Sequence, residues 1–117
     1  MTDWKSYVSH LECGATGERL EADRLHNLSP AGKPILVRYD LDALARDLDR
    51  DRLATRAPDL WRYRELLPVL DPSNAVSLGE TATPVLRLDA VVSGGPLFIK
   101  DEGRLPTGSF KARGLCL

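Results

Sequence analysis

One segment, residues 96–114, constrains this chain most, because it has to form a strand, a turn and the start of a helix in quick succession. Its first four residues are apolar and favour a strand, and the stretch that follows is rich in turn formers. Thr107 or Ser109 is suited to cap a helix beginning directly afterwards. We therefore expect Lys111 in a first helical turn.

The position of Lys111 has a chemical consequence. The exposed backbone N–H groups and the dipole of a helix start oppose a positive charge, and partial burial opposes it too, which favours the neutral amine. A neutral lysine amine is the nucleophile that attacks an aldehyde. The alternative is a solvated lysine at a helix start, since most lysines are exposed. The local pattern alone leaves both interpretations open.

Residues 106–114, Pro-Thr-Gly-Ser-Phe-Lys-Ala-Arg-Gly, resemble the cofactor-lysine motif of the fold-type II pyridoxal-phosphate enzymes, and among these most of all threonine synthase. Three upstream segments, residues 34–41, 61–69 and 77–84, also resemble threonine synthase, in the same order. The lysine motif is fairly specific evidence for the superfamily, but it is weak evidence for which reaction is catalysed. The four segments in the same order are strong evidence for the threonine synthase family.

The resemblance implies an α/β fold of the fold-type II class, which is also called tryptophan synthase β-like. It further implies that this chain is the N-terminal portion of such an enzyme. Such enzymes hold the cofactor between two domains, whereas 117 residues bury one modest core. The family's Gly-rich phosphate loop is not found, since the pair Gly94–Gly95 lies between β-favouring runs and predicts a hairpin turn. We expect a truncated piece that is inactive alone.

For an intact protein, the resemblance implies pyridoxal 5'-phosphate as cofactor and conversion of O-phospho-L-homoserine and water to L-threonine and phosphate. Lys111 would hold the cofactor and move protons as general base and acid. Phe110 would pack against the cofactor, and Ser109 would shape the turn. Arg113 would either assist electrostatically or form an ion pair on the helix surface.

Residues 77–84 form the expected loop before a strand over residues 85–88, because Thr83 precedes a proline and is pushed towards extended geometry. The family pattern is Gly-Glu-Gly-x-Thr-Pro-Leu, and Thr81 replaces its second glycine, which matters if the backbone needs a positive φ there. Glu80 and Thr83 are candidates for the substrate cleft. A purely structural role in the turn is the alternative for each.

Many threonine synthase-like proteins carry a zinc-ribbon-like element with two Cys-x-x-Cys pairs near the N-terminus. Here only Cys13 stands at those positions, and Thr16, Leu28 and Ala31 occupy the others. A structural zinc site needs four nitrogen or sulfur ligands, so no metal is expected.

His10 and His26 do not complete such a site, since their spacing matches no ribbon pattern. We expect residues 1–40 to form a degenerate ribbon in which apolar side chains pack where the ions would lie. The expected packing residues are Leu11, Leu20, Leu25, Leu28 and Ile35.

The middle of the chain, residues 41–76, is expected to be helical and to precede the truncated start of the cofactor domain at residues 77–117. Apolar residues at helical spacing predict a helix over residues 41–48 with Asp40 as its N-cap. Residues 58–67 are bounded by prolines and predict a short helix, whose residues 60, 63 and 67 share one face.

Composition indicates a cytoplasmic chain, since charged residues make up 28%, the formal net charge is −1, and no apolar run is long enough to span a membrane. Neither nucleic acid nor a membrane is an expected partner. An intact enzyme would bind a small phosphorylated amino acid, and a homo-oligomer is a candidate assembly. Two rival hypotheses stay open: another fold-type II enzyme, such as threonine dehydratase or a β-replacement lyase, and a non-catalytic fragment.

Overall fold

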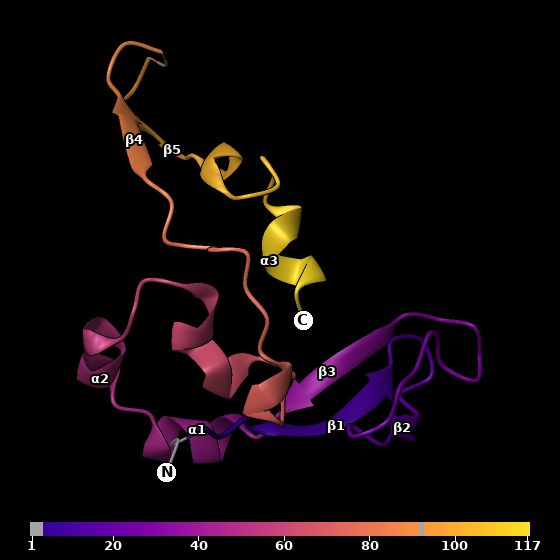
Figure 1. Ribbon diagram of the computed structural model, residues 1–117. Coiled ribbons are helices and arrows are strands. Elements are labelled where there is room, and N and C mark those ends of the chain that lie inside the picture. Colours follow the sequence, from indigo (N-terminus) through magenta and orange to yellow (C-terminus); the bar gives the residue numbers. More distant parts are fainter. Residues whose placement is uncertain (1–3, 92) are drawn as a thin grey trace. The chain divides into compact units, whose positions relative to one another are not determined.

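The computed structural model describes residues 4–91 and 93–117, and its elements are mixed α and β, as expected (Figure 1). The chain forms two compact units. Unit 1 contains the described residues up to Arg56 together with Tyr63–Ala75. Unit 2 contains Ala57–Arg62 and Val76–Leu117.

Unit 1 is built around a three-stranded antiparallel sheet of order β2-β1-β3, whose strands are β1 (Val8–Cys13), β2 (Arg19–Leu20) and β3 (Ile35–Tyr39). Leu11 pairs with Leu20 on one side and with Val37 on the other. Burial alternates along β3 with the two-residue period of a strand that has one covered face.

Two short helices follow the sheet, α1 (Leu41–Asp47) and α2 (Arg50–Thr55). The predicted N-cap is confirmed, because the Asp40 side chain accepts a hydrogen bond from the Ala43 backbone N–H at 2.9 Å. Of the apolar residues predicted to share a face, Leu44 is buried but Leu41 is 61% exposed. Helix α2 lies within residues 41–76, which were expected to be helical, although its bounds were not predicted.

The helix expected near Trp61 forms as a 3-10 helix, Leu60–Leu66, that is interrupted at Tyr63 (φ −105°, ψ 24°). Because of this kink, the predicted shared face is wrong: Leu67 is buried, whereas Tyr63 is 46% exposed. A second 3-10 helix, Pro72–Asn74, begins after the capping side chain of Asp71.

The core of unit 1 is small, and its buried apolar residues are Tyr7, Cys13, Leu44, Leu67 and Val69. The predicted packing of Leu25 and Leu28 in place of metal ions is wrong, because these side chains are 101% and 50% exposed. Both lie in the irregular segment between β2 and β3, where no regular element directs them inward. Ser29 is the buried residue there, and it accepts a hydrogen bond from the Cys13 thiol at 3.1 Å.

Unit 2 contains a β-hairpin, formed by β4 (Val85–Leu88) and β5 (Leu97–Lys100). Both strands were expected, and the predicted glycine turn is confirmed by the positive φ of Gly94 and Gly95. A 3-10 helix, Glu102–Arg104, and the helix α3 (Lys111–Leu115) follow. In neither unit does a described helix have the length and apolar character needed to cross a membrane.

Candidate active site

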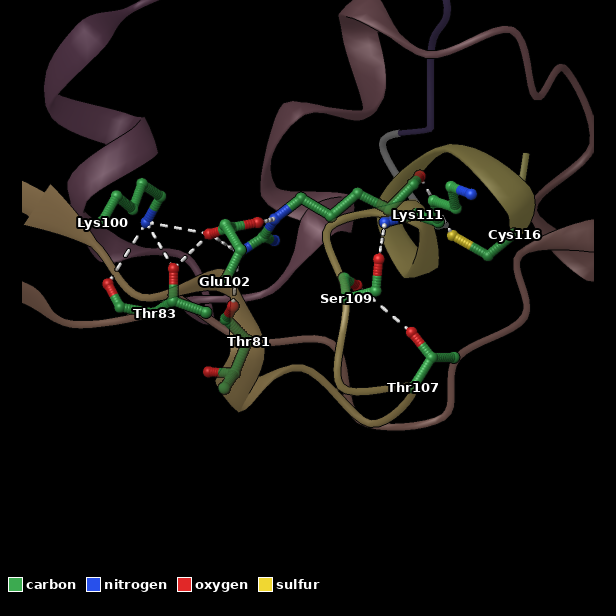
Figure 2. Close-up of polar contacts among 9 residues, drawn as sticks. Thr81, Thr83, Lys100, Glu102, Thr107, Ser109, Lys111 and Cys116 are labelled. Carbon is green, nitrogen blue, oxygen red and sulfur yellow. Dashed lines mark hydrogen bonds and ion pairs between the residues drawn. The ribbon is translucent and has the colours of Figure 1, made fainter.

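Lys111 is the first residue of α3, so its predicted place in a first helical turn is confirmed. The expected partial burial is wrong, because Lys111 is exposed. Its backbone N–H donates to the Ser109 hydroxyl at 3.3 Å, while its amine has no hydrogen-bond or ion-pair partner among the described residues (Figure 2). The amine is therefore open to a ligand from solvent.

The turn before α3 is closed by local hydrogen bonds. Gly108 has a φ of 67°, and its N–H donates to the Leu105 carbonyl at 2.7 Å. The Thr107 hydroxyl donates to the Ser109 carbonyl at 3.2 Å. Neither of the predicted caps is the N-cap residue, which is Phe110 and makes no side-chain capping bond. Phe110 is itself 66% exposed.

A polar cluster joins the loop before β4 to the end of β5 (Figure 2). Lys100 Nζ donates to the Thr83 hydroxyl at 2.6 Å and to the Thr83 carbonyl at 3.2 Å. It also lies 3.4 Å from Glu102 Oε1, which accepts a hydrogen bond from the Thr83 hydroxyl. Thr83 is 7% exposed, so this candidate cleft residue is buried and its side chain is engaged.

Arg113 ties α3 to the same cluster. Its Nε lies 2.7 Å from Glu102 Oε2, and one terminal nitrogen donates to the Thr81 carbonyl at 2.9 Å. The interpretation of Arg113 as an ion-pair residue is confirmed. Thr81 itself needs no left-handed backbone, because no described residue other than glycine has a positive φ.

Glu80, the other candidate cleft residue, is 2% exposed. Its carboxylate accepts hydrogen bonds from the Ser77 hydroxyl at 2.7 Å and the Leu78 N–H at 3.0 Å, and the Ser77 bond is the main cause that lowers the pKa of Glu80. Glu80 borders a cavity of about 240 Å³, lined by Val76, Ser77, Leu78, Glu80, Thr107, Ala112, Leu115 and Cys116. Lys111 does not line this cavity.

Sequence comparison adds to this geometry. The chain is 35% identical to the threonine synthase of Methanocaldococcus jannaschii over 106 residues, and 34% identical to that of Methanosarcina acetivorans over 112 residues. These matches cover 88% and 93% of the chain, and 26% of each relative. The threonine synthase of Halalkalibacterium halodurans is 40% identical over 60 residues, which cover 50% of the chain and 17% of that protein.

The chain is related to the N-terminal portion of threonine synthase. It spans about a quarter of the length of the two archaeal threonine synthases. No protein-family model and no solved structure matches the chain.

The residues that threonine synthase would need for its cofactor fit this structure only in part. The open amine of Lys111 suits a covalent link to an aldehyde. A phosphate cradle is not formed by Gly94 and Gly95, because they lie in the open turn between β4 and β5. Among the described residues, no group of three or more His, Cys, Asp or Glu side chains is arranged to hold a metal ion.

Lys100 and Glu102 are the site residues that the sequence reasoning missed. They stand in the turn-rich run before the lysine motif, where charged residues are usually solvated. The signal that could have identified them is their spacing, since Lys100 ends a strand and Glu102 follows two residues later. This spacing places both side chains beside the loop before β4.

Glu102 predicts how the stability of unit 2 depends on pH. Hydrogen bonds from Arg113, and next from Thr83, lower the pKa of Glu102 from its ordinary 4.5 to about 2. Because the folded-state pKa lies below the unfolded value, the stabilising contribution is fully present above about pH 4.5 and is lost as pH falls through about 2.

We therefore expect unit 2 to lose stability between about pH 5 and about pH 2, and Glu102→Gln to flatten this part of the profile. Denaturant unfolding at a series of pH values, followed by amide hydrogen exchange of residues 97–115, measures the effect. An equally steep profile in the variant would contradict the assignment.

Proposed function

We propose that the chain is the N-terminal portion of a pyridoxal-phosphate enzyme of the threonine synthase type, and that Lys111 is the lysine that holds the cofactor. The observation that carries this proposal is the exposed, unpartnered amine of Lys111 at the start of α3. It is supported by matches to threonine synthases over 88% and 93% of the chain.

In the whole protein, the proposed reaction converts O-phospho-L-homoserine and water to L-threonine and phosphate. Bound pyridoxal phosphate supplies an electron sink for carbanion character in the substrate. The Lys111 amine then moves protons to and from the substrate carbons as general base and acid. Phe110, whose ring is exposed next to Lys111, packs against the cofactor, and Ser109 fixes the backbone N–H of Lys111.

Glu80 stays our candidate for the border of the substrate cleft, because its buried carboxylate lies beside the cavity of unit 2. Thr83 also stays a candidate residue of the substrate cleft, and its role is to hold Lys100 and Glu102 through hydrogen bonds of its hydroxyl. Further, we propose a fold-type II architecture for the whole enzyme and a degenerate zinc-ribbon origin for the sheet of unit 1. The location is cytoplasmic, and this chain alone is inactive.

The rival fold-type II reactions, threonine dehydration and β-replacement, share the lysine motif but find less support. All three of the relatives described above are threonine synthases. The side chains that would recognise a substrate phosphate distinguish these reactions.

Reductive trapping tests the role of Lys111. The chain is mixed with pyridoxal phosphate and borohydride, and mass spectrometry measures the adduct on each lysine. We expect Lys111 to carry about ten times the adduct of Lys33. Lys33, like Lys111, is exposed, and it lies in unit 1 outside the proposed cofactor motif. Lys111→Arg should remove the main adduct, while Lys33→Arg should leave it. Labelling spread evenly over the lysines would contradict the proposal.

A further inference from the structure

The two lysines of unit 2 have opposite surroundings. Lys100 Nζ contacts the hydroxyl and carbonyl of Thr83 and lies 3.4 Å from Glu102. The amine of Lys111 forms no hydrogen bond or ion pair with a described residue. Both lysines stand within one short stretch of chain, so a carbonyl compound that enters this unit meets two amines of unequal availability (Figure 2).

The acidic side chains of unit 2 explain why Lys111 stays unpaired. Glu102 is engaged by Lys100, Thr83 and Arg113. The remaining acidic residues also have partners: Arg62 N–H for Asp59, Ser77 and Leu78 for Glu80, Arg87 for Asp89, and Arg104 for Asp101. Each described acidic side chain of this unit thus has a partner other than Lys111.

The contact between Glu102 and Arg113 also directs α3. Arg113 is two residues after Lys111, which places the two side chains about 200° apart around a helix. Arg113 is drawn towards Glu102 and the Thr81 carbonyl, and the intervening Ala112 is 5% exposed. With these positions fixed, Lys111 is on the open side of the helix, in agreement with its exposure.

We propose that Glu102 is a positioning residue that determines which lysine of unit 2 reacts with a carbonyl ligand. Glu102 makes Lys100 less available for reaction because it forms an ion pair with the Lys100 ammonium group. Its ion pair with Arg113 fixes the orientation of α3, which leaves Lys111 on the exposed side of that helix. The inference deepens the proposed function and rests on it for the identity of the ligand, whereas the selection between the two amines is a property of this chain alone.

The chemistry of the selection is simple. An amine attacks the carbonyl carbon with its lone pair, and water leaves to give a C=N bond. The Lys100 amine first has to give up its hydrogen bonds to Thr83 and its ion pair with Glu102, whereas Lys111 has no such interactions with described residues to give up. Lys100 should consequently react more slowly than Lys111, although its side chain is 52% exposed.

Reductive methylation measures both amines without any cofactor pocket. The full chain is treated with isotopically labelled formaldehyde and cyanoborohydride, which transfers hydride to the C=N bond, and mass spectrometry gives the rate at each lysine. In the unmodified chain we expect Lys100 to react about fivefold more slowly than Lys111. Glu102→Gln should raise the Lys100 rate towards that of Lys111, while the two hydrogen bonds to Thr83 keep it below that rate.

Asp101→Asn is the matched control. Asp101 is the neighbouring carboxylate, its partner is Arg104, and it makes no contact with Lys100. We expect this variant to leave the rates of both lysines unchanged. A Lys100 rate that rises equally in Asp101→Asn, or that does not rise in Glu102→Gln, would overturn the proposal.

Amide hydrogen exchange of residues 97–115 shows whether each variant stays folded. If Glu102→Gln unfolds unit 2, Thr83→Val gives the complementary test, because it removes the hydroxyl partner of Lys100 and keeps Glu102. The Lys100 rate should then stay below that of Lys111, and a rate equal to that of Lys111 would overturn the role of Glu102. The outcome is also separable from that of the proposed function. Pyridoxal-phosphate labelling that is spread evenly over the lysines would refute the cofactor role of Lys111. If the methylation rate of Lys100 still rose in Glu102→Gln and not in Asp101→Asn, the role of Glu102 would be upheld.

Discussion

Replacing Arg56 with alanine is expected to lower the free energy of unfolding of unit 1 by about 3 kcal/mol. The Arg56 guanidinium donates two hydrogen bonds, at 2.6 and 2.8 Å, to the two carboxylate oxygens of Glu65. The side chains are only 13% and 11% exposed. Burial is the largest single influence on the pKa of Glu65 and acts to raise it. The hydrogen bonds and charge of Arg56, a backbone hydrogen bond and the charge of Arg64 together outweigh burial, and the pKa lies below its ordinary value.

The large effect has a physical reason. Without Arg56, the Glu65 carboxylate stays buried but loses one of its main partners. A buried charge without compensation lowers the free energy of unfolding strongly. Urea unfolding followed by circular dichroism measures the change. Arg38→Ala is the control, because Arg38 pairs with Glu12 at 2.6 Å while 47% exposed, and such a pair is worth about 1 kcal/mol or less. Equal losses in the two variants would contradict the prediction.

Leu105→Ala is expected to destabilise unit 2 by about 3 kcal/mol. Leu105 is 3% exposed and is the only large apolar side chain that is buried among the described residues of this unit. Its carbonyl also accepts the hydrogen bond that closes the turn before α3. Since the unit buries so little apolar surface, this loss is a large fraction of the free energy of unfolding of a small domain.

Amide hydrogen exchange measures this loss for residues 97–115, where we expect protection to disappear in the variant. Leu115→Ala is the matched control, because it removes the same atoms from a side chain that is 81% exposed. Protection that survives Leu105→Ala, or that is lost equally in Leu115→Ala, would show that the contacts of Leu105 do not hold the unit together.

Local signals in the sequence predicted local structure well. Turn-forming residues located both strands of the hairpin, the glycine turn and the start of α3. Proline fixes its own φ and glycine permits the positive φ that many turns need, wherever they occur. The N-cap role of Asp40 was likewise readable, since it depends only on the neighbouring Ala43 N–H. The ordered motifs also led to threonine synthase, which the sequence matches then supported.

Features that depend on distant partners were not predictable. The periodicity of residues 58–67 indicated a single helical face, but the kink at Tyr63 redirects that side chain to solvent. Leu25 and Leu28 are apolar and were expected inside, yet no regular element orients them. The pairing of Glu102 with Arg113 joins residues from two different helices, and hydrophobic periodicity carries no information about such a contact.

The kinked 3-10 helix has a consequence for any attempt to divide the chain. The polypeptide contributes Ala57–Arg62 to unit 2, returns to unit 1 through Tyr63–Ala75, and then completes unit 2. The early piece is attached by contacts of Pro58 and Asp59 with Thr81 and Ala82.

A single cut after Ala75 would therefore leave part of unit 2 on the wrong fragment. Its pairing with Thr81 would become a bimolecular association and would lose the high effective concentration that the connecting chain now provides. Because the units are interleaved, neither can be inherited, expressed or exchanged as one uninterrupted piece of sequence. The segment through the kink works as a covalent tether that makes the assembly of unit 2 intramolecular.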